Sequence, residues 1–372
     1  MTEIRTAKFA QDDVSSADTL FARLKYKAWQ QGVPLTGLFE LTPRCTLDCE
    51  MCYVHLTQNQ IPHPELDTAQ WLSLMEQACD EGMMFATLTG GECLLYPGFS
   101  DLYQYLTDRG VLVTVLTNGT LLNEEWVSWL SGRTPQRVQI SVYGSTPEAC
   151  KGVTGSSGAF DKVDRGIDLL RKYNIPFELA ITVSRNLVED FENILRYCLQ
   201  KEPRNCIVNS CPFDARPETE RKFSDYAPTL DQQVDIFRIQ MSVFTEVFNS
   251  KRDTLTQRPR HTRENPRITP SGISCSAGRN SFSITWEGKM LPCSVFDYAG
   301  VYPLRDGFAA SWKLLNMSCL EFVNPDACAT CTYYNACRFC PAGHYMRVGE
   351  GHAEPSVCAE AHRMVAEGIR VL

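Results

Sequence analysis

Three cysteines in one short segment are the residues of this 372-residue chain best suited to metal chemistry. Cys45, Cys49 and Cys52 lie close together, and the aromatic residue Tyr53 follows the third cysteine directly. A four-iron, four-sulfur cluster takes four cysteine ligands, so three thiolates leave one iron able to chelate an outside ligand. Catalytic zinc sites also keep an open position, which makes zinc the main alternative metal. The segment therefore predicts a metal centre with one position reserved for a ligand.

A second group of cysteines lies near the C-terminus and contains Cys-x-x-Cys pairs, which suit clusters and zinc ribbons alike. The chain has 17 cysteines in all, and residues 1–30 lack the pattern of a signal peptide. Cytosolic thiols are kept reduced, so ligation explains the bunching better than disulfides do. The members of this group are Cys275, Cys293, Cys328, Cys331, Cys337, Cys340 and Cys358.

Alternating apolar runs and amphipathic stretches predict the elements that position these residues. Their rhythm is typical of repeated strand-helix units and a parallel sheet, so we expect an α/β fold. The expected strands are residues 37–42, 84–89, 111–116, 137–142, 176–183 and 206–210. Helices are expected at 67–81, 99–109, 123–130, 160–173, 189–200 and 230–248, with Asp67 and Asn123 as caps of two of them.

The segments that follow the expected strands are rich in Gly, Asn, Ser and Cys. In barrels of parallel strands, ligands bind at the loops after the carboxyl ends of the strands. The cysteine segment after the first strand and residues 90–93 after the second are two such loops. We expect these loops to converge on one mouth.

The spacing of Cys45, Cys49 and Cys52, followed by Tyr53, resembles the signature of the radical S-adenosylmethionine (radical SAM) superfamily. In that family the open iron chelates the amino and carboxylate groups of S-adenosylmethionine. One electron then cleaves the sulfonium, and the resulting 5'-deoxyadenosyl radical removes a hydrogen atom from the substrate. The resemblance implies that the three cysteines hold the catalytic cluster and that Tyr53 lies near the adenine.

The second loop is similar to the Gly-Gly-Glu motif of the family, which binds the methionine amino group. Glycines allow close approach of the backbone to a ligand, and a glutamate supplies charge for an ammonium. Taken alone, the same residues would form an ordinary turn. The residues concerned are Thr89, Gly90, Gly91 and Glu92.

Three further residues are candidates for contacts with S-adenosylmethionine. Ser141, at the end of the fourth strand, resembles the serine that contacts the methionine carboxylate in related enzymes. Arg165 could pair with the same carboxylate, or it could be a surface charge. Asn118 is either a ribose or backbone contact or part of an ordinary Asn-Gly turn.

The C-terminal cysteines look like the SPASM extension of radical SAM enzymes, which binds two auxiliary four-iron clusters. The resemblance assigns Cys275, Cys293 and Cys340 to the first cluster, which leaves it one cysteine short. An open iron, a non-cysteine ligand or a cysteine from elsewhere, such as Cys319, would complete it. To the second cluster the resemblance assigns Cys328, Cys331, Cys337 and Cys358.

These assignments predict a partial (β/α)6 radical SAM barrel followed by a small cysteine-rich SPASM domain. The chain would then carry three four-iron clusters in all. We expect an N-terminal extension at 1–36, the barrel at 37–250, a linker at 251–273, the SPASM domain at 274–361 and a C-terminal helix at 362–372.

Charge and hydropathy limit the partners. The net charge of -8 and the isoelectric point near 5.4 argue against a nucleic-acid binder, since phosphate affinity needs clustered positive charge. No apolar run approaches the roughly 20 residues that span a bilayer, so we expect a cytoplasmic enzyme that does not insert into membranes. A peptide or a small molecule is the better substrate.

The leading hypothesis for the reaction is oxidative cross-linking or thioether formation in a ribosomal peptide, with electrons supplied by a donor such as flavodoxin or ferredoxin. The alternatives are dehydrogenation of a small metabolite or tetrapyrrole side chain, sulfatase-type protein maturation, and a non-catalytic iron-sulfur electron carrier. Only some 36 residues precede the first strand, so a ribosomal-peptide substrate would need a separate leader-binding protein, an internal binding surface or no leader at all. Residues 214–222 and the basic stretch 251–267 are possible contact surfaces.

Sulfatase maturases carry an aspartate directly after an auxiliary-cluster cysteine and use it as a base. Here Ser294 follows Cys293, which makes that reaction less favoured. Other conceivable bases are Tyr143, Glu178, Asp214 and Asp297.

Overall fold

The computed structural model describes residues 16–54, 56–210, 223–250, 271–337 and 339–370. A single eight-stranded sheet runs through the molecule in the order β6-β5-β4-β3-β2-β1-β7-β8. Neighbouring strands are parallel from β6 to β7, and only β8 is antiparallel to its neighbour. The strands are β1 (Thr36–Glu40), β2 (Phe85–Thr89), β3 (Leu112–Thr117), β4 (Arg137–Val142), β5 (Phe177–Val183), β6 (Cys206–Ser210), β7 (Ser281–Ile284) and β8 (Met290–Leu291).

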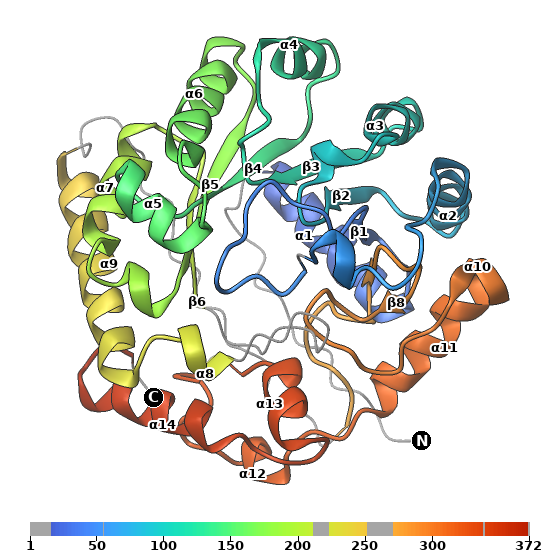
Figure 1. Ribbon diagram of the computed structural model, residues 1–372. Helices are drawn as coiled ribbons and strands as arrows, with labels where there is room; N and C mark the ends of the chain where they lie inside the picture. Colours follow the sequence, from blue (N-terminus) through green and yellow to red (C-terminus); the bar gives the residue numbers. More distant parts are fainter. Residues whose placement is uncertain (1–15, 55, 211–222, 251–270, 338, 371–372) are drawn as a thin grey trace.

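Helices cover the outer face of this curved sheet, and in Figure 1 α2, α3, α4, α6 and α7 line the outside of the strands. The β/α alternation expected from the sequence is confirmed, and element ends differ from the prediction by one or two residues in most cases. The helices are α1 (Ser16–Gln31), α2 (Thr68–Asp80), α3 (Phe99–Asp108), α4 (Glu124–Gly132), α5 (Pro147–Thr154), α6 (Ala159–Lys172), α7 (Phe191–Gln200), α8 (Phe223–Tyr226), α9 (Leu230–Ser250), α10 (Pro303–Asp306), α11 (Phe308–Glu321), α12 (Asp326–Ala329), α13 (Pro341–Val348) and α14 (Pro355–Ala366).

Two of these helices begin at the caps that the sequence predicts. The Asp67 carboxylate accepts a hydrogen bond from the Gln70 backbone N–H at 2.8 Å, and the Gln70 side chain accepts one from the Asp67 N–H at 2.9 Å. Asn123 accepts from the Trp126 N–H at 2.9 Å. Each cap satisfies a backbone donor that the first helical turn leaves free.

The C-terminal helix differs from the predicted range of 362–372. Helix α14 spans Pro355–Ala366, so it begins earlier and contains Cys358. Pro355 occupies the first turn, where a missing N–H costs nothing, and the Glu354 side chain accepts a hydrogen bond from the Ser356 N–H at 3.2 Å.

The cysteine-rich C-terminal region shares the main sheet with the barrel. Strand β7 pairs with β1 in parallel, with Phe39 opposite Ile284, and Phe282 packs edge-to-face on Phe39 at 5.8 Å between ring centroids. The expected domain boundary near residue 274 stays a prediction, but the sheet continues across it. Hydrogen bonding therefore ties the two regions together.

The same region also reaches the far side of the barrel. In Figure 1, α12, α13 and α14 follow the open side between β8 and α9. Ion pairs join α14 to α9, between Arg363 and Asp231 at 3.2 Å and between Glu367 and Arg238 at 2.5 Å. The C-terminal segment thus closes the side that six strands leave open.

Candidate active site at the carboxyl edge of the sheet

The loop that carries Cys45, Cys49 and Cys52 follows β1, at the edge where the parallel strands end. Two backbone hydrogen bonds fix it against α5, from the Asp48 N–H to the Thr154 carbonyl at 3.0 Å and from the Glu50 N–H to the Val153 carbonyl at 3.1 Å. Sequence reasoning did not predict α5. A helix absent from the expected pattern therefore sets the position of the cysteine loop.

The three thiols sit in a low-dielectric setting, with Cys49 buried and Cys45 and Cys52 half-buried. Burial raises the pKa of Cys45 to about 11, although hydrogen bonds from the Leu47 backbone and the Asn118 side chain lower it. A bound metal favours the thiolate, so ligation would offset the cost of deprotonation. These sites are therefore suited to holding positive metal charge.

The Gly-Gly-Glu segment packs directly on the cysteine loop. The Gly91 N–H donates to the Thr42 carbonyl at 2.7 Å, and the Glu92 N–H donates to the Arg44 carbonyl at 2.8 Å. A Cβ on Gly91 would overlap the Arg44 carbonyl oxygen and lie 2.7 Å from that of Pro43. Glycine is required at position 91 because the two loops touch there and leave no room for a side chain. This reason is separate from the need for a ligand to approach the backbone closely.

Glu92 is fully buried and is used within the protein. Its carboxylate accepts hydrogen bonds from the Thr117 hydroxyl at 2.8 Å, the Asn118 N–H at 2.8 Å and the Leu94 N–H at 3.1 Å. Burial raises the pKa of Glu92, while these donors act to lower it. The predicted contact of Glu92 with a methionine ammonium stays a prediction. What the structure shows is that Glu92 joins the loop after β2 to the loop after β3.

Asn118 connects the loop after β3 to the cysteine loop. Its side-chain amide donates to the Cys45 sulfur at 3.3 Å and to the Thr46 hydroxyl at 3.0 Å. Its carbonyl oxygen accepts from the Thr120 N–H at 2.9 Å, the geometry of an Asx turn. The turn and the site contact, which the sequence offered as alternatives, are both present.

The other predicted contacts differ in position. Ser141 is half-buried at the end of β4, Thr89 is half-buried as the last residue of β2, and Tyr53 is half-buried in the cysteine loop. Arg165 is exposed on α6. The roles of all four toward S-adenosylmethionine stay predictions.

The candidate bases have defined surroundings. Burial, followed by the Cys49 thiol, raises the pKa of Tyr143 well above its ordinary value, so Tyr143 is a neutral phenol at neutral pH. Glu178 pairs with Arg137 at 3.0 Å, and Asp297 pairs with Lys289 at 2.7 Å. Asp214, and with it the possible contact surfaces at 214–222 and 251–267, lies outside the described residues.

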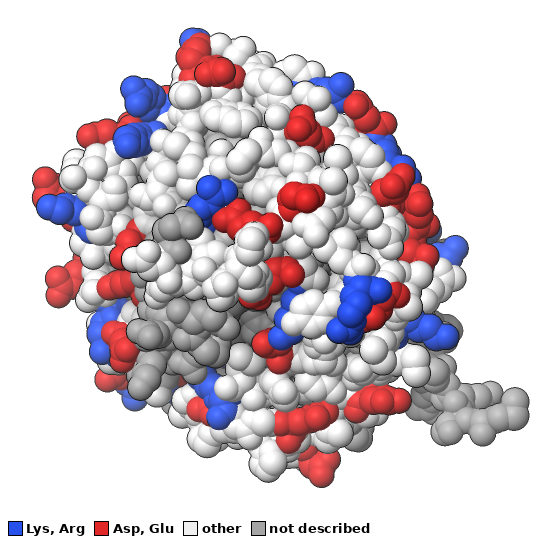
Figure 2. All heavy atoms as spheres, turned by 45° about the vertical axis from the view of Figure 1, so that its right-hand side comes forward, with Lys and Arg blue, Asp and Glu red and all other residues white. Residues whose placement is uncertain are grey.

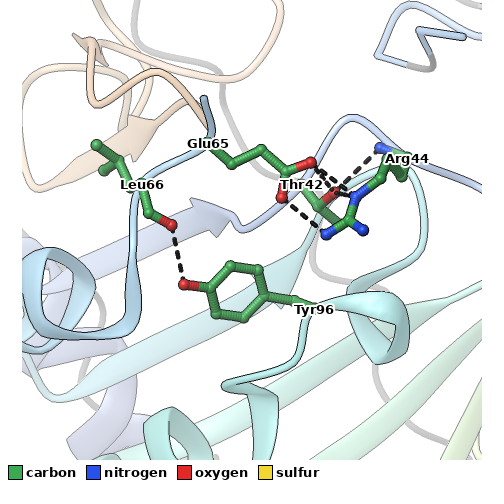
Figure 3. Close-up of polar contacts among 5 residues, drawn as sticks. All are labelled: Thr42, Arg44, Glu65, Leu66 and Tyr96. Carbon is green, nitrogen blue, oxygen red and sulfur yellow. Dashed lines mark hydrogen bonds and ion pairs between the residues drawn. The ribbon is translucent and has the colours of Figure 1, made fainter. Parts of the chain in front are cut away.

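Sequence reasoning missed a latch on the other side of the cysteine loop, shown in Figure 3. Arg44 donates two hydrogen bonds to Glu65, at 2.8 and 3.0 Å, and the Thr42 hydroxyl donates to the same carboxylate at 3.0 Å. The Tyr96 hydroxyl donates to the Leu66 carbonyl at 2.9 Å. The segment before α2 is thereby held against the loop, which no local motif indicates.

A second missed contact comes from the loop after β5. Glu50, between the second and third cysteines, accepts from the Ser184 hydroxyl at 2.5 Å and from the Asn186 amide at 2.6 Å. Polar residues just after a strand end were the available signal. The cysteine loop is thus anchored to the loops after β2, β3 and β5.

The C-terminal cysteines gather in two sets. Burial raises the pKa of Cys337 to about 12, and the next causes are Cys358 and Cys328, with Cys331 also contributing. For Cys293, burial raises the pKa to about 12, and Cys340 and Cys275 add to it. The assignment of these cysteines as cluster ligands stays a prediction.

The donor chemistry fits iron-sulfur clusters. Among the described residues every cysteine is free of disulfides. Within the same part of the chain, no three His, Cys, Asp or Glu side chains converge closely enough to hold a single metal ion. Thiolates are soft ligands of the kind that iron-sulfur clusters take.

Comparison with known proteins defines the class. Residues 39–198 match the family model described as the Radical SAM superfamily, so this part of the chain is a radical SAM domain. The matched span begins in β1 and ends in α7, so it contains the cysteine loop and the contacts described above.

Similar proteins fall into two groups by name. The chain is 25% identical to the "AdoMet-dependent heme synthase" of Methanosarcina barkeri, over 86% of this chain and 95% of the relative. It is 30% identical to the "Sporulation killing factor maturation protein SkfB" of Bacillus subtilis, over 45% of this chain and 40% of that protein. The fold is shared with the solved structure of anSMEcpe with bound AdoMet and Kp18Cys peptide, at a TM-score of 0.66 and 18% identity, covering 90% of this chain and 98% of that chain.

Proposed function

We propose that this enzyme reductively cleaves S-adenosylmethionine and oxidatively modifies a peptide, forming a cross-link or a thioether. The single observation that carries the proposal is the loop of Cys45, Cys49 and Cys52, fixed by contacts to the loops after β2, β3 and β5. When bound, the cluster and S-adenosylmethionine supply a 5'-deoxyadenosyl radical that removes a hydrogen atom from the substrate.

The protein's own residues hold the cysteine loop in place and shield the radical from solvent. The Asn118 side chain donates a hydrogen bond to the Cys45 sulfur, and the Asn118 backbone N–H donates one to the Glu92 carboxylate. The Arg44–Glu65 latch closes one side of the loop. Such preorganisation matters because a reactive radical must meet its substrate before it meets solvent.

The electron balance assigns a role to the C-terminal cysteines. Removal of one hydrogen atom leaves a substrate radical, and forming the new bond requires that radical to lose a second electron and a proton. We propose that a cluster at the first auxiliary set accepts the electron and that the proton leaves to solvent. A small electron-transfer protein such as flavodoxin or ferredoxin would reduce the catalytic cluster.

A peptide substrate is supported by the fold shared with anSMEcpe, whose structure holds both AdoMet and a peptide. The name of SkfB, a maturation protein, is consistent with the same chemistry over the matched part. A sulfatase-type reaction is less supported, because Asp297 is paired with Lys289 and Ser294 takes the position after Cys293.

A second candidate is oxidation of a tetrapyrrole side chain. The observation in its favour is the match to a heme synthase along nearly the whole of both chains. The rival from another class, an electron carrier, would leave the contacts around Asn118 and Glu92 without a use in catalysis.

The proposal is tested by anaerobic incubation of the reconstituted enzyme with S-adenosylmethionine, a reductant and one of two substrates. One is a synthetic peptide that contains Cys, Trp, Tyr and Lys, and the other is an iron porphyrin with propionate side chains. Mass spectrometry should show loss of two hydrogen atoms from the peptide and no change in the porphyrin. Modification of the porphyrin alone would favour the second candidate, and consumption of neither would contradict the peptide assignment.

A further inference from the structure

A cysteine outside the family pattern lies beside the first auxiliary set. Cys319 is fully buried in the last turn of α11. Burial raises its pKa to about 12, and the neighbouring thiols Cys275 and Cys293 add to the effect, while Arg279 opposes it. Cys340 acts in the same way on Cys275 and Cys293. Four thiols from four separate segments therefore share one neighbourhood.

Backbone contacts hold Cys319 against the turn that carries Cys275. The Ile273 N–H donates to the Cys319 carbonyl at 2.9 Å. Gly278 lies so close to the Cys319 sulfur that a Cβ on this glycine would overlap it, and its φ of +63° also favours glycine. The Gly278 N–H donates to the Pro292 carbonyl at 3.3 Å, next to Cys293. The three segments are thus locked together.

Arg279, a cation without a carboxylate partner among the described residues, lies next to Cys319 and Cys275. The Arg279 guanidinium stacks on Trp29 at 3.9 Å and donates to the carbonyls of Ile273, at 3.3 Å, and of Trp29, at 3.5 Å. Its Nε is buried without a hydrogen-bond partner, and within the described residues no ion pair to a carboxylate is found. Burial lowers the pKa of Arg279, and Cys319 followed by Cys275 raises it.

Arg279 is half-buried, and a guanidinium that is partly withdrawn from water is stabilised by a nearby anion. Neutral thiols do not supply one. A cluster held by four thiolates is anionic and would accept a hydrogen bond at sulfur.

We propose that Cys319 is the fourth protein ligand of the first auxiliary cluster, with Cys275, Cys293 and Cys340, and that the half-buried Arg279 is its counter-charge. This deepens the proposed function, on which it rests for the presence of a cluster. A closed set leaves no iron free to bind substrate sulfur. The first auxiliary cluster would then act by accepting an electron and not by holding the substrate.

The test uses the full chain with Cys45, Cys49 and Cys52 replaced by alanine, so that only the auxiliary sites bind iron. To this parent we add Cys319→Ala or, as a matched control, Cys198→Ala, which removes another fully buried helical cysteine. The measurements are iron and sulfide per chain, and electron paramagnetic resonance (EPR) of the reduced protein with and without cyanide.

The parent should bind about eight irons, two four-iron clusters, and its EPR spectrum should not respond to cyanide. Cys319→Ala should lose iron from one cluster or acquire a cyanide-dependent spectrum, because one iron becomes accessible. Cys319→Ser should retain iron with an altered spectrum, since serine oxygen can ligate, and this variant guards against misfolding of the alanine form. Cys198→Ala should behave as the parent.

An unchanged iron content and spectrum in both Cys319 variants would overturn the assignment, as would a cyanide response in the parent. Neither readout involves cleavage of S-adenosylmethionine. If wild-type enzyme cleaves S-adenosylmethionine while the Cys319 variants match the parent, this inference alone fails. If wild-type enzyme binds zinc in place of iron, the proposed function fails with it.

Discussion

Single residues act on this site through hydrogen bonds to the cysteine sulfurs. Asn118 donates to Cys45 at 3.3 Å, and the Leu47 N–H donates to the same sulfur at 3.5 Å. Such bonds stabilise the more negative, reduced state of a cluster and so raise its reduction potential.

We therefore predict that Asn118→Ala shifts the midpoint potential of the catalytic cluster to a more negative value. The measurement is an EPR-monitored redox titration. Asn123→Ala is the control, because it removes the same side chain at a helix cap and touches no cysteine. Equal potentials for Asn118→Ala and wild type would show that the amide does not tune the cluster.

Close packing at Gly91 gives a second prediction at this scale. Gly91→Ala should displace the Arg44 carbonyl and with it the cysteine loop, and reduce bound iron by about four atoms per chain. Gly132→Ala, on α4 with open space around it, should keep full iron content and gain up to about 1 kcal/mol of stability. Iron analysis and thermal melting compare the two, and a full complement of iron in Gly91→Ala would refute the packing argument.

Residue chemistry was predictable where it depends on local spacing. The cysteine segment is such a case, because three thiols in one loop are adjacent whatever the fold. The Arg44–Glu65 latch and the Glu50–Ser184 bond join residues far apart in sequence, so their pairing follows from the tertiary fold. The sequence offered Cys319 only as one of several ways to complete the first auxiliary set, because its approach to Cys275 depends on the packing of α11.

At the level of secondary-structure elements, N-terminal caps fix the residue at which each helix begins. Asp67 forms a reciprocal capping box with Gln70 at the start of α2, just after the latch segment. Asp67→Ala should lower the free energy of unfolding by about 1 kcal/mol. Glu76→Ala, on an exposed position of the same helix, should change it much less. Anaerobic urea denaturation measures both, and equal effects would argue against the cap.

The order of strands and helices was accessible from the sequence because apolar periodicity records which face of each element is buried. Helix α5 and strand β7 were not. Helix α5 is a short segment between β4 and α6, and Ser281–Ile284 gains its strand identity only by pairing with β1. Short elements of this kind carry too few residues for a periodic signal.

For the whole molecule, the shared sheet makes the barrel and the cysteine-rich region one folding unit. Strand β7 lies beside β1, and the Trp312 indole N–H donates to the Gly32 carbonyl at 2.6 Å. We predict that tryptophan fluorescence and cluster absorbance change together in one anaerobic urea transition. Loss of part of the absorbance at a lower urea concentration, with fluorescence unchanged, would indicate two independent units.

The surface carries charges of both signs. On the face shown in Figure 2, acidic and basic side chains are interspersed, with broad uncharged areas between them. This fits the net charge of -8. Across the ranges that the structure describes, none of the helices is long and apolar enough to cross a bilayer.

Reductive cleavage of S-adenosylmethionine by the reconstituted enzyme is the decisive measurement for the role of the cysteine loop. With dithionite and no substrate, wild-type protein should release 5'-deoxyadenosine and methionine in equal amounts. The variant with Cys45, Cys49 and Cys52 replaced by alanine should release neither, while keeping its auxiliary iron. Cleavage by the triple variant at the wild-type rate, or no cleavage by iron-replete wild type, would contradict the assignment of this loop as the catalytic centre.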